Sequence, residues 1–144
     1  MNTAPEICSC SAVRQAARHL TRLYDDALAP TRLSLNQYSI MSKLLRLGPQ
    51  MIQDLADLLV MDRSTLGHLL RPLERQGWLT IRVSDLDKRQ RVIALTTAGM
   101  AHVKKAKRLW AQAERSFQSA FGEDRALSLR TVLKHVTTIA FDRT

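Results

Sequence analysis

The chain has 144 residues, with 22 Lys and Arg against 13 Asp and Glu, which gives a formal net charge of +9 at pH 7. Its length fits one domain, and its 45% hydrophobic residues exclude disorder along the whole chain. Two cysteines are too few for a disulfide scaffold, no apolar run is long enough to cross a membrane, and no signal peptide is visible, so the sequence predicts a cytoplasmic protein. The excess of positive charge predicts a polyanionic partner.

The first third of the chain shows helical periodicity. An amphipathic helix is predicted to end before Pro30, and Ser34 is a typical N-cap for a second helix over residues 35–47, which Gly48 and Pro49 stop. The apolar face of the first helix consists of Val13, Ala16, Leu20, Leu23 and Ala27.

Two helices joined by a short turn are predicted next, over residues 51–59 and 63–76. Asp62 is a candidate N-cap of the second of these helices, and Gly77 is placed to end it. Leu66, Leu69, Leu70 and Leu73 repeat at the spacing of one buried helix face. This arrangement is typical of a helix-turn-helix.

The outer face of the second helix in this motif is polar. Hydroxyl, imidazole and guanidinium groups suit phosphates and base edges, and the N-terminal half of this helix enters the major groove in helix-turn-helix proteins. Any solvated surface helix also shows a polar face, so that alternative stays open. Pro72 is predicted to kink the axis and to separate a DNA-facing half from a packed half. The outward residues are Ser64, Thr65, His68, Arg71 and Arg75.

After Gly77 the pattern becomes that of a hairpin, with strands over residues 78–83 and 91–96 and a polar loop between them. A basic hairpin directly after a helix-turn-helix is typical of a wing, which places an Arg in the minor groove where the potential is most negative. Asp87 is expected to orient Arg89 or Arg91 by a charge-assisted hydrogen bond. The basic residues of this hairpin are Lys88, Arg89 and Arg91, and they begin a stretch to residue 113 with seven Lys and Arg and no acid.

Two helices complete the predicted order α-α-α-α-β-β-α-α. Thr97 is a candidate cap of a long helix to Phe121, and the last helix follows Gly122. The long helix carries a coiled-coil-like seam of Val103, Ala106, Trp110, Ala113, Phe117 and Ala120. The last one carries an apolar face of Leu129, Val132, Val136, Ile139 and Ala140. Since one small core cannot cover all these faces, the terminal helices are predicted to join two chains.

The sequence thus predicts a mainly α fold with a small β-hairpin wing, divided into an N-terminal dimerisation helix (1–33), a winged helix-turn-helix domain (34–98) and C-terminal dimerisation helices (99–144). Over nearly its whole length the chain resembles the MarR family of winged helix-turn-helix transcriptional regulators. The resemblance rests on LA at 55–56, RSTL at 63–66, LERQG at 73–77, DKR at 87–89 and LTTAG at 95–99.

The resemblance implies a homodimer, joined through its terminal helices, that binds double-stranded DNA at a pseudo-palindrome with two recognition helices one helical turn apart. It implies a sequence-specific regulator, as a repressor, that a small molecule or cysteine oxidation releases. It carries DNA-contacting roles onto Ser64, Thr65, His68, Arg71 and Arg89.

Two other classes of protein are alternatives to a specific DNA-binding regulator. An enzyme has little support, since the sequence contains no glycine-rich phosphate loop, no nucleophile elbow and no zinc-protease motif, so no catalytic residue and no cofactor are expected. The alternative to a specific regulator is a non-specific, nucleoid-type protein that coats DNA. Membrane binding is disfavoured because the apolar faces are committed to the core and the dimer.

Cys8 and Cys10 precede the first helix and leave three interpretations open: a metal site, an incidental pair and a redox sensor. The four histidines show no supporting spacing for a metal, so none is expected. A thiolate would be stabilised by the helix N-terminus and by Arg14. In the hydroperoxide-sensing branch of the MarR family the reactive cysteine lies fourteen residues before a tyrosine, as Cys10 does before Tyr24, but the second tyrosine of that branch is Leu35 here.

An effector pocket is the other mode of control in this family. A small aromatic or acidic molecule would lie between the dimerisation helices and the winged domain. Candidate lining residues are His19, Tyr38 and Trp110, with Arg14 or Arg18 placed to meet a carboxylate. The alternative for each is a core or surface role, since a Trp in a helical seam ordinarily packs.

Overall fold

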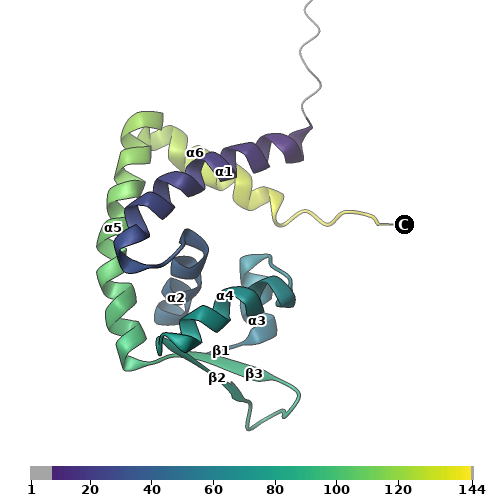
Figure 1. Ribbon diagram of the computed structural model, residues 1–144. Helices are drawn as coiled ribbons and strands as arrows, with labels where there is room; N and C mark the ends of the chain where they lie inside the picture. Colours follow the sequence, from purple (N-terminus) through teal and green to yellow (C-terminus); the bar gives the residue numbers. More distant parts are fainter. Residues whose placement is uncertain (1–7, 144) are drawn as a thin grey trace, which may run out of the picture.

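Residues 8–143 are described by the computed structural model, in which one small sheet lies at one end of a mainly helical molecule (Figure 1). The predicted fold class, mainly α with a small winged sheet, is confirmed. Its elements are α1 (Ser9–Leu28), η1 (Ala29–Thr31), α2 (Leu35–Leu47), β1 (Gln50–Met51), α3 (Ile52–Leu59), α4 (Arg63–Arg75), β2 (Leu79–Val83), β3 (Arg91–Leu95), α5 (Thr97–Phe121) and α6 (Glu123–Val136).

Local capping sets most helix ends. Ser34 and Gln37 form a capping box at α2, in which the Ser34 Oγ accepts the Gln37 N–H at 3.1 Å and the Gln37 Oε1 accepts the Ser34 N–H at 3.1 Å. Asp62 caps α4, and Gly77 follows its end with a φ of +77°. These three predictions are confirmed.

The predicted cap of the long helix is wrong by one residue. Thr96 holds the extended N-cap conformation and its Oγ1 accepts the Gly99 N–H at 3.0 Å, whereas Thr97 is the first residue of α5. The last helix also ends earlier than predicted. Because α6 ends at Val136, Ile139 and Ala140 lie beyond it.

The sheet has one more strand than the predicted hairpin. β1 pairs antiparallel with β3, with Gln50 opposite Ile93 and Met51 opposite Val92, so the strand order is β1-β3-β2. Two residues are too few for an alternating pattern to be recognised in the sequence. The β2–β3 pairing runs from Leu79 opposite Leu95 to Val83 opposite Arg91 and projects the hairpin away from the helices (Figure 1).

The predicted seam of α5 faces its own chain. α5 packs against α1, α2 and α6 as it runs along one side of the molecule from the sheet to α6 (Figure 1). Val103 and Ala106 are fully buried in the core of the winged region, together with Ile40, Leu66 and Ile93. The interpretation of this seam as a coiled coil is therefore wrong for these positions, because a helical period indicates that a face is buried and does not indicate by which chain.

Candidate nucleic-acid interface

α4 presents one apolar and one polar face. Leu66, Leu70 and Leu73 are buried, and the opposite face is exposed at all five of the outward residues predicted from the sequence. At its N-terminus the Asp62 carboxylate accepts the Thr65 N–H at 2.7 Å and the Thr65 hydroxyl at 2.9 Å. The backbone N–H and then the hydroxyl of Thr65 hold the pKa of Asp62 below its usual value. The Thr65 hydroxyl proton is thus used in the cap, and its oxygen lone pairs remain for a ligand.

Pro72 lies inside α4, and the helix continues beyond it to Arg75. Proline has no N–H to donate to the carbonyl one turn earlier, but its own carbonyl accepts the Gln76 N–H at 3.0 Å. The helix is continuous, and its division into two functional halves stays a prediction.

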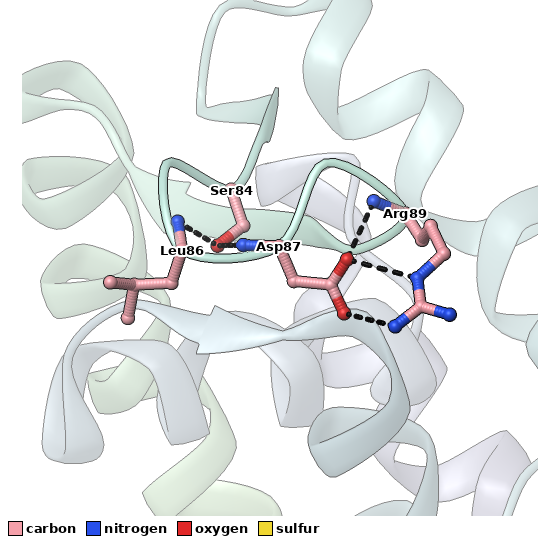
Figure 2. A network of polar contacts seen from close by, with 4 residues as sticks. All are labelled: Ser84, Leu86, Asp87 and Arg89. Carbon is pink, nitrogen blue, oxygen red and sulfur yellow. Dashed lines mark hydrogen bonds and ion pairs between the residues drawn. The ribbon is translucent and has the colours of Figure 1, made fainter.

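The tip of the β2–β3 hairpin is held by its own side chains (Figure 2). The buried Ser84 Oγ accepts the N–H groups of Leu86 at 3.2 Å and of Asp87 at 3.4 Å. The Ser84 N–H donates to the Gln90 carbonyl at 3.0 Å, and the Gln90 N–H donates to the Asp87 carbonyl at 2.9 Å. These bonds give the tip a defined backbone conformation.

Asp87 holds Arg89 on this tip, as Figure 2 shows. Its Oδ1 accepts the Arg89 backbone N–H at 3.0 Å and the Nε–H at 3.1 Å, and its Oδ2 accepts an Nη2–H at 3.3 Å. The Arg89 side chain lowers the pKa of Asp87. Of the two partners that the sequence left open for Asp87, the structure pairs it with Arg89. The Arg89 side chain is 89% exposed and keeps further N–H donors for a ligand.

Lys88 and Arg91 are exposed beside this pair. The wing and the outer face of α4 therefore carry exposed cationic and hydroxyl groups. The hairpin lies at the end of the molecule opposite to the crossing of α1 and α6 (Figure 1).

Contacts that the sequence did not predict connect the end of α4 to α5. The Thr96 Oγ1 donates to the Gly77 carbonyl at 2.6 Å, and the Thr96 N–H donates to the Trp78 carbonyl at 3.1 Å. A Cβ on Gly99 would lie 1.8 Å from that carbonyl oxygen, so only glycine allows this approach. The matched LERQG and LTTAG segments thus meet in space.

The same junction extends to η1. The Trp78 ring stacks on His102 with ring centroids 3.9 Å apart, and the His102 Nε2–H donates to the Thr31 carbonyl at 2.8 Å. In the sequence, the only sign of this junction was Gly99, a glycine that closely follows the second predicted strand. The partners of Gly99 were invisible there because the contacts are long-range.

The five residues predicted to form one effector pocket line three separate hollows. Tyr38 and Trp110 stack with centroids 5.8 Å apart and line a hollow of about 300 Å³ between α2 and α5. His19 lines another of about 550 Å³ between α1 and α5. Arg14 and Arg18 line a third of about 330 Å³ with both cysteines. The structure does not bring these five residues together in one hollow of a single chain, and their role in binding an effector stays a prediction.

Two lysines missed by the sequence analysis line the hollow between α2 and α5. Lys43 is half-buried and Lys107 is exposed, and the Ser39 hydroxyl accepts a Lys43 Nζ–H at 3.3 Å. Burial lowers the pKa of Lys43, and the nearby charges of Arg46 and Lys134 lower it further. This hollow combines an aromatic wall with a cluster of positive charge.

The cysteines are both free and exposed at the start of α1. The Cys8 Sγ accepts the Ser11 N–H at 3.2 Å and so caps the helix. Tyr24, which matched Cys10 by spacing, instead donates its hydroxyl to the Glu114 carboxylate, which also accepts from Arg130 at 3.1 Å. Burial, and then the bond to Glu114, raise the pKa of Tyr24.

Two further observations hold for residues 8–143. No three or more His, Cys, Asp or Glu side chains gather where they could hold a metal ion. No helix of this part has the length and apolar character needed to cross a membrane.

Comparison with known proteins places this geometry in a family. Residues 33–90 match the family model described as "MarR family". The chain is 30% identical over 120 residues to the HTH-type transcriptional regulator PecS of Dickeya dadantii (strain 3937), covering 81% of this chain and 72% of PecS.

Solved structures show the same fold. NadR in complex with 4-hydroxyphenylacetate superposes with a TM-score of 0.76 at 22% identity, covering 97% of this chain and all of that one. A mutant of MarR from E. coli complexed with operator DNA superposes with a TM-score of 0.77 at 22% identity, covering 87% of this chain and 90% of that one. The match to the family model, the relationship to PecS and the shared fold agree with the matched segments around α4 and the wing. The chain belongs to the MarR family of transcriptional regulators.

Proposed function

We propose that the protein is a homodimeric repressor that binds a pseudo-palindromic operator. Each protomer would place α4 in a major groove and Arg89 of its wing in the neighbouring minor groove. The observation that carries this proposal is the Asp87–Arg89 pair, which presents an exposed guanidinium on the hydrogen-bonded tip of the hairpin that follows α4. The MarR mutant with the same fold was solved with operator DNA bound.

The proposed contacts divide into two kinds. On α4, Ser64, His68 and Arg71 would read base edges, while Thr65 and Arg75 would contact phosphates. On the wing, Arg89 would enter the minor groove, and Lys88 and Arg91 would neutralise phosphates. Asp87 would keep Arg89 in place before DNA arrives, which lowers the entropy that binding costs.

The proposed dimer rests on the apolar side chains that α1 and α6 leave exposed. α6 buries only Ala126 and leaves apolar side chains exposed, and Val13 of α1 is exposed as well. A second copy that packs α1 and α6 against the same helices would remove this surface from water. The exposed apolar residues of α6 are Leu127, Val132, Leu133 and Val136.

The DNA-binding proposal is tested by fluorescence anisotropy with a duplex selected from a random-sequence library and with a scrambled duplex. A specific regulator should prefer the selected duplex by about 10³-fold or more. Arg89→Ala should weaken binding by about 1–3 kcal/mol. Arg115→Ala on α5, another exposed arginine, is the matched control and should bind as the wild type does. Equal affinity for both duplexes would instead indicate a nucleoid-type coating protein.

We infer that the hollow between α2 and α5 binds an anionic aromatic effector that releases DNA. The Tyr38–Trp110 pair would stack on the ring, and Lys43 with Lys107 would meet the carboxylate. Like charges around Lys43 oppose one another, and an anion would relieve that repulsion. NadR, which shares the fold, was solved with an aromatic acid bound.

Titration calorimetry with 4-hydroxyphenylacetate and with its neutral amide tests this effector site. The acid should bind the wild type more tightly than the amide does, and Lys43→Gln should remove the difference. Lys104→Gln, an exposed lysine of α5 outside the hollow, is the control. Equal binding of acid and amide would argue against the charge-based recognition.

Oxidation of the cysteines is a second proposed route of release. The Cys8 thiol lies at the helix N-terminus, in a hollow that it shares with Cys10, Arg14 and Arg18, and positive charge favours the reactive thiolate. Peroxide treatment should weaken operator binding of the wild type and leave a Cys8→Ser, Cys10→Ser double variant unchanged. An equal loss in both proteins would assign the effect to other residues.

A further inference from the structure

Apart from Met100 on α5, the exposed large apolar residues among residues 8–143 fall into two groups. One group lies on α1, on α6 and in the segment after α6, where a second copy of the chain would cover it. The other group lies on the winged region, and it includes the two most exposed of all, Leu86 at 92% and Val60 at 74%. Leu86 belongs to the loop between β2 and β3, and this hairpin lies at the end of the molecule opposite to α1 and α6, away from the proposed dimer (Figure 1).

The exposure of Leu86 is built into the tip. Its backbone N–H donates to the Ser84 Oγ, and Ser84 is itself buried. The Leu86 side chain leaves the loop on the side away from the Asp87–Arg89 pair (Figure 2). The wing therefore presents two side chains, one apolar and one cationic, at separate points along its edge.

The chemistry of Leu86 indicates what it would touch. Asp85 and Asp87 flank it in sequence, and Arg89 compensates Asp87. Leucine has neither a charge nor a hydrogen-bonding group, so the Leu86 side chain cannot bind a phosphate. The sugars and base edges inside a groove are the parts of DNA that suit an apolar side chain at this place.

We propose that Leu86 is a specificity-determining residue that enters the same minor groove as Arg89, at a separate point along the edge of the wing, and selects A·T over G·C pairs at the operator flank. This inference rests on the proposed binding of operator DNA. Apolar side chains of minor-groove proteins pack between sugars and against base edges. The Leu86 contact adds apolar burial to the charge contacts of the wing, so its contribution does not depend on salt.

The selectivity follows from hydrogen-bond chemistry. In the minor groove a G·C pair presents the guanine N2 amino donor, which an A·T pair lacks. Leucine has no acceptor, so covering that donor with Leu86 would remove its water and leave it unsatisfied. An inosine·C pair lacks the amino group but keeps the major-groove pattern of G·C, so it separates the two grooves experimentally.

The experiment uses the full chain and the duplex that the wild type selects from a random-sequence library. Minor-groove footprinting locates the base pairs of the operator flank that the wing contacts. Affinity is then measured for duplexes that carry A·T, G·C or inosine·C pairs at these positions. The wild type should bind the A·T and inosine·C duplexes alike and the G·C duplex about tenfold more weakly. Leu86→Ala should bind all three alike and keep its preference for the selected centre of the duplex.

Lys88→Ala, on the same exposed tip, is the matched control. It should weaken binding to all three flanks equally and reduce the dependence of log K on log salt by about one, whereas Leu86→Ala should leave that slope unchanged. A flank preference that persists in Leu86→Ala, a wild type without any flank preference, or inosine·C behaving as G·C does would each overturn the inference. A wild type that does not prefer the selected duplex to a scrambled one would overturn the proposed function along with it.

Discussion

The winged region and the α1–α6 end of the molecule differ in how they bury their apolar residues. In the winged region the apolar faces of α3, α4 and the sheet close on one another, and Leu55, Leu70 and Ile93 are inaccessible to solvent. α6 buries only Ala126 and leaves most of its apolar side chains exposed. The winged region therefore buries its core within one chain, whereas the α1–α6 end leaves an apolar surface that the proposed second copy would cover.

The largest expected effect comes from replacing a valine by glutamate in each of the two regions. Val103 is 1% exposed in the winged core and Val132 is 61% exposed on α6. Val103→Glu buries a carboxylate without a partner and should destabilise the chain by about 4 kcal/mol or more. Val132→Glu should leave the fold of the protomer intact and dissociate the dimer. Urea denaturation and sedimentation velocity measure the two effects; an intact dimer in Val132→Glu would exclude this face as the interface.

Two glycines test how tightly the end of α4 is joined to α5. Gly99→Ala forces a Cβ into the Trp78 carbonyl and should destabilise the fold by about 1–3 kcal/mol. Gly67 of α4 has open space where a Cβ would lie, so Gly67→Ala should stabilise the fold by about 0.5–1 kcal/mol. Urea denaturation of both variants gives the comparison. If Gly99→Ala were as stable as the wild type, the junction would not be rigid.

Local patterns predicted much of the fold, and long-range contacts account for most of what was missed. The bounds of α2 follow from Ser34 and Gly48, which act on their own neighbours, and the Asp87–Arg89 pair spans only two residues. β1 was missed because its hydrogen bonds come from β3, more than forty positions away. The sequence did not predict that Lys43 and Lys107 line one hollow, because they belong to two helices that only the fold brings together.

Val60 marks a strained position within the otherwise well-packed winged region. It lies in the turn before α4 with a φ of +52°, a conformation that a β-branched residue rarely adopts, and its side chain is largely exposed. Asparagine tolerates this region better, so Val60→Asn should stabilise the fold by about 1 kcal/mol. Thermal denaturation provides the measurement. A lower melting temperature would mean that the Val60 side chain contributes packing that outweighs the strain.

The N-cap of α4 should make the winged region slightly sensitive to acid. The pKa of Asp62 is lowered in the folded protein by the backbone N–H of Thr65, so the unfolded chain binds the proton more readily. The stabilisation is therefore present above the ordinary aspartate pKa of about 3.9 and is lost as the pH falls below it through the folded value. Asp62→Asn keeps an N-cap but cannot titrate, so its stability should fall less steeply with acid. Urea denaturation at a series of pH values from neutral to strongly acidic measures this slope. Equal slopes in the two proteins would show that the cap carboxylate has no preference for the folded state, and the acid sensitivity of the winged region would then have to come from other carboxylates.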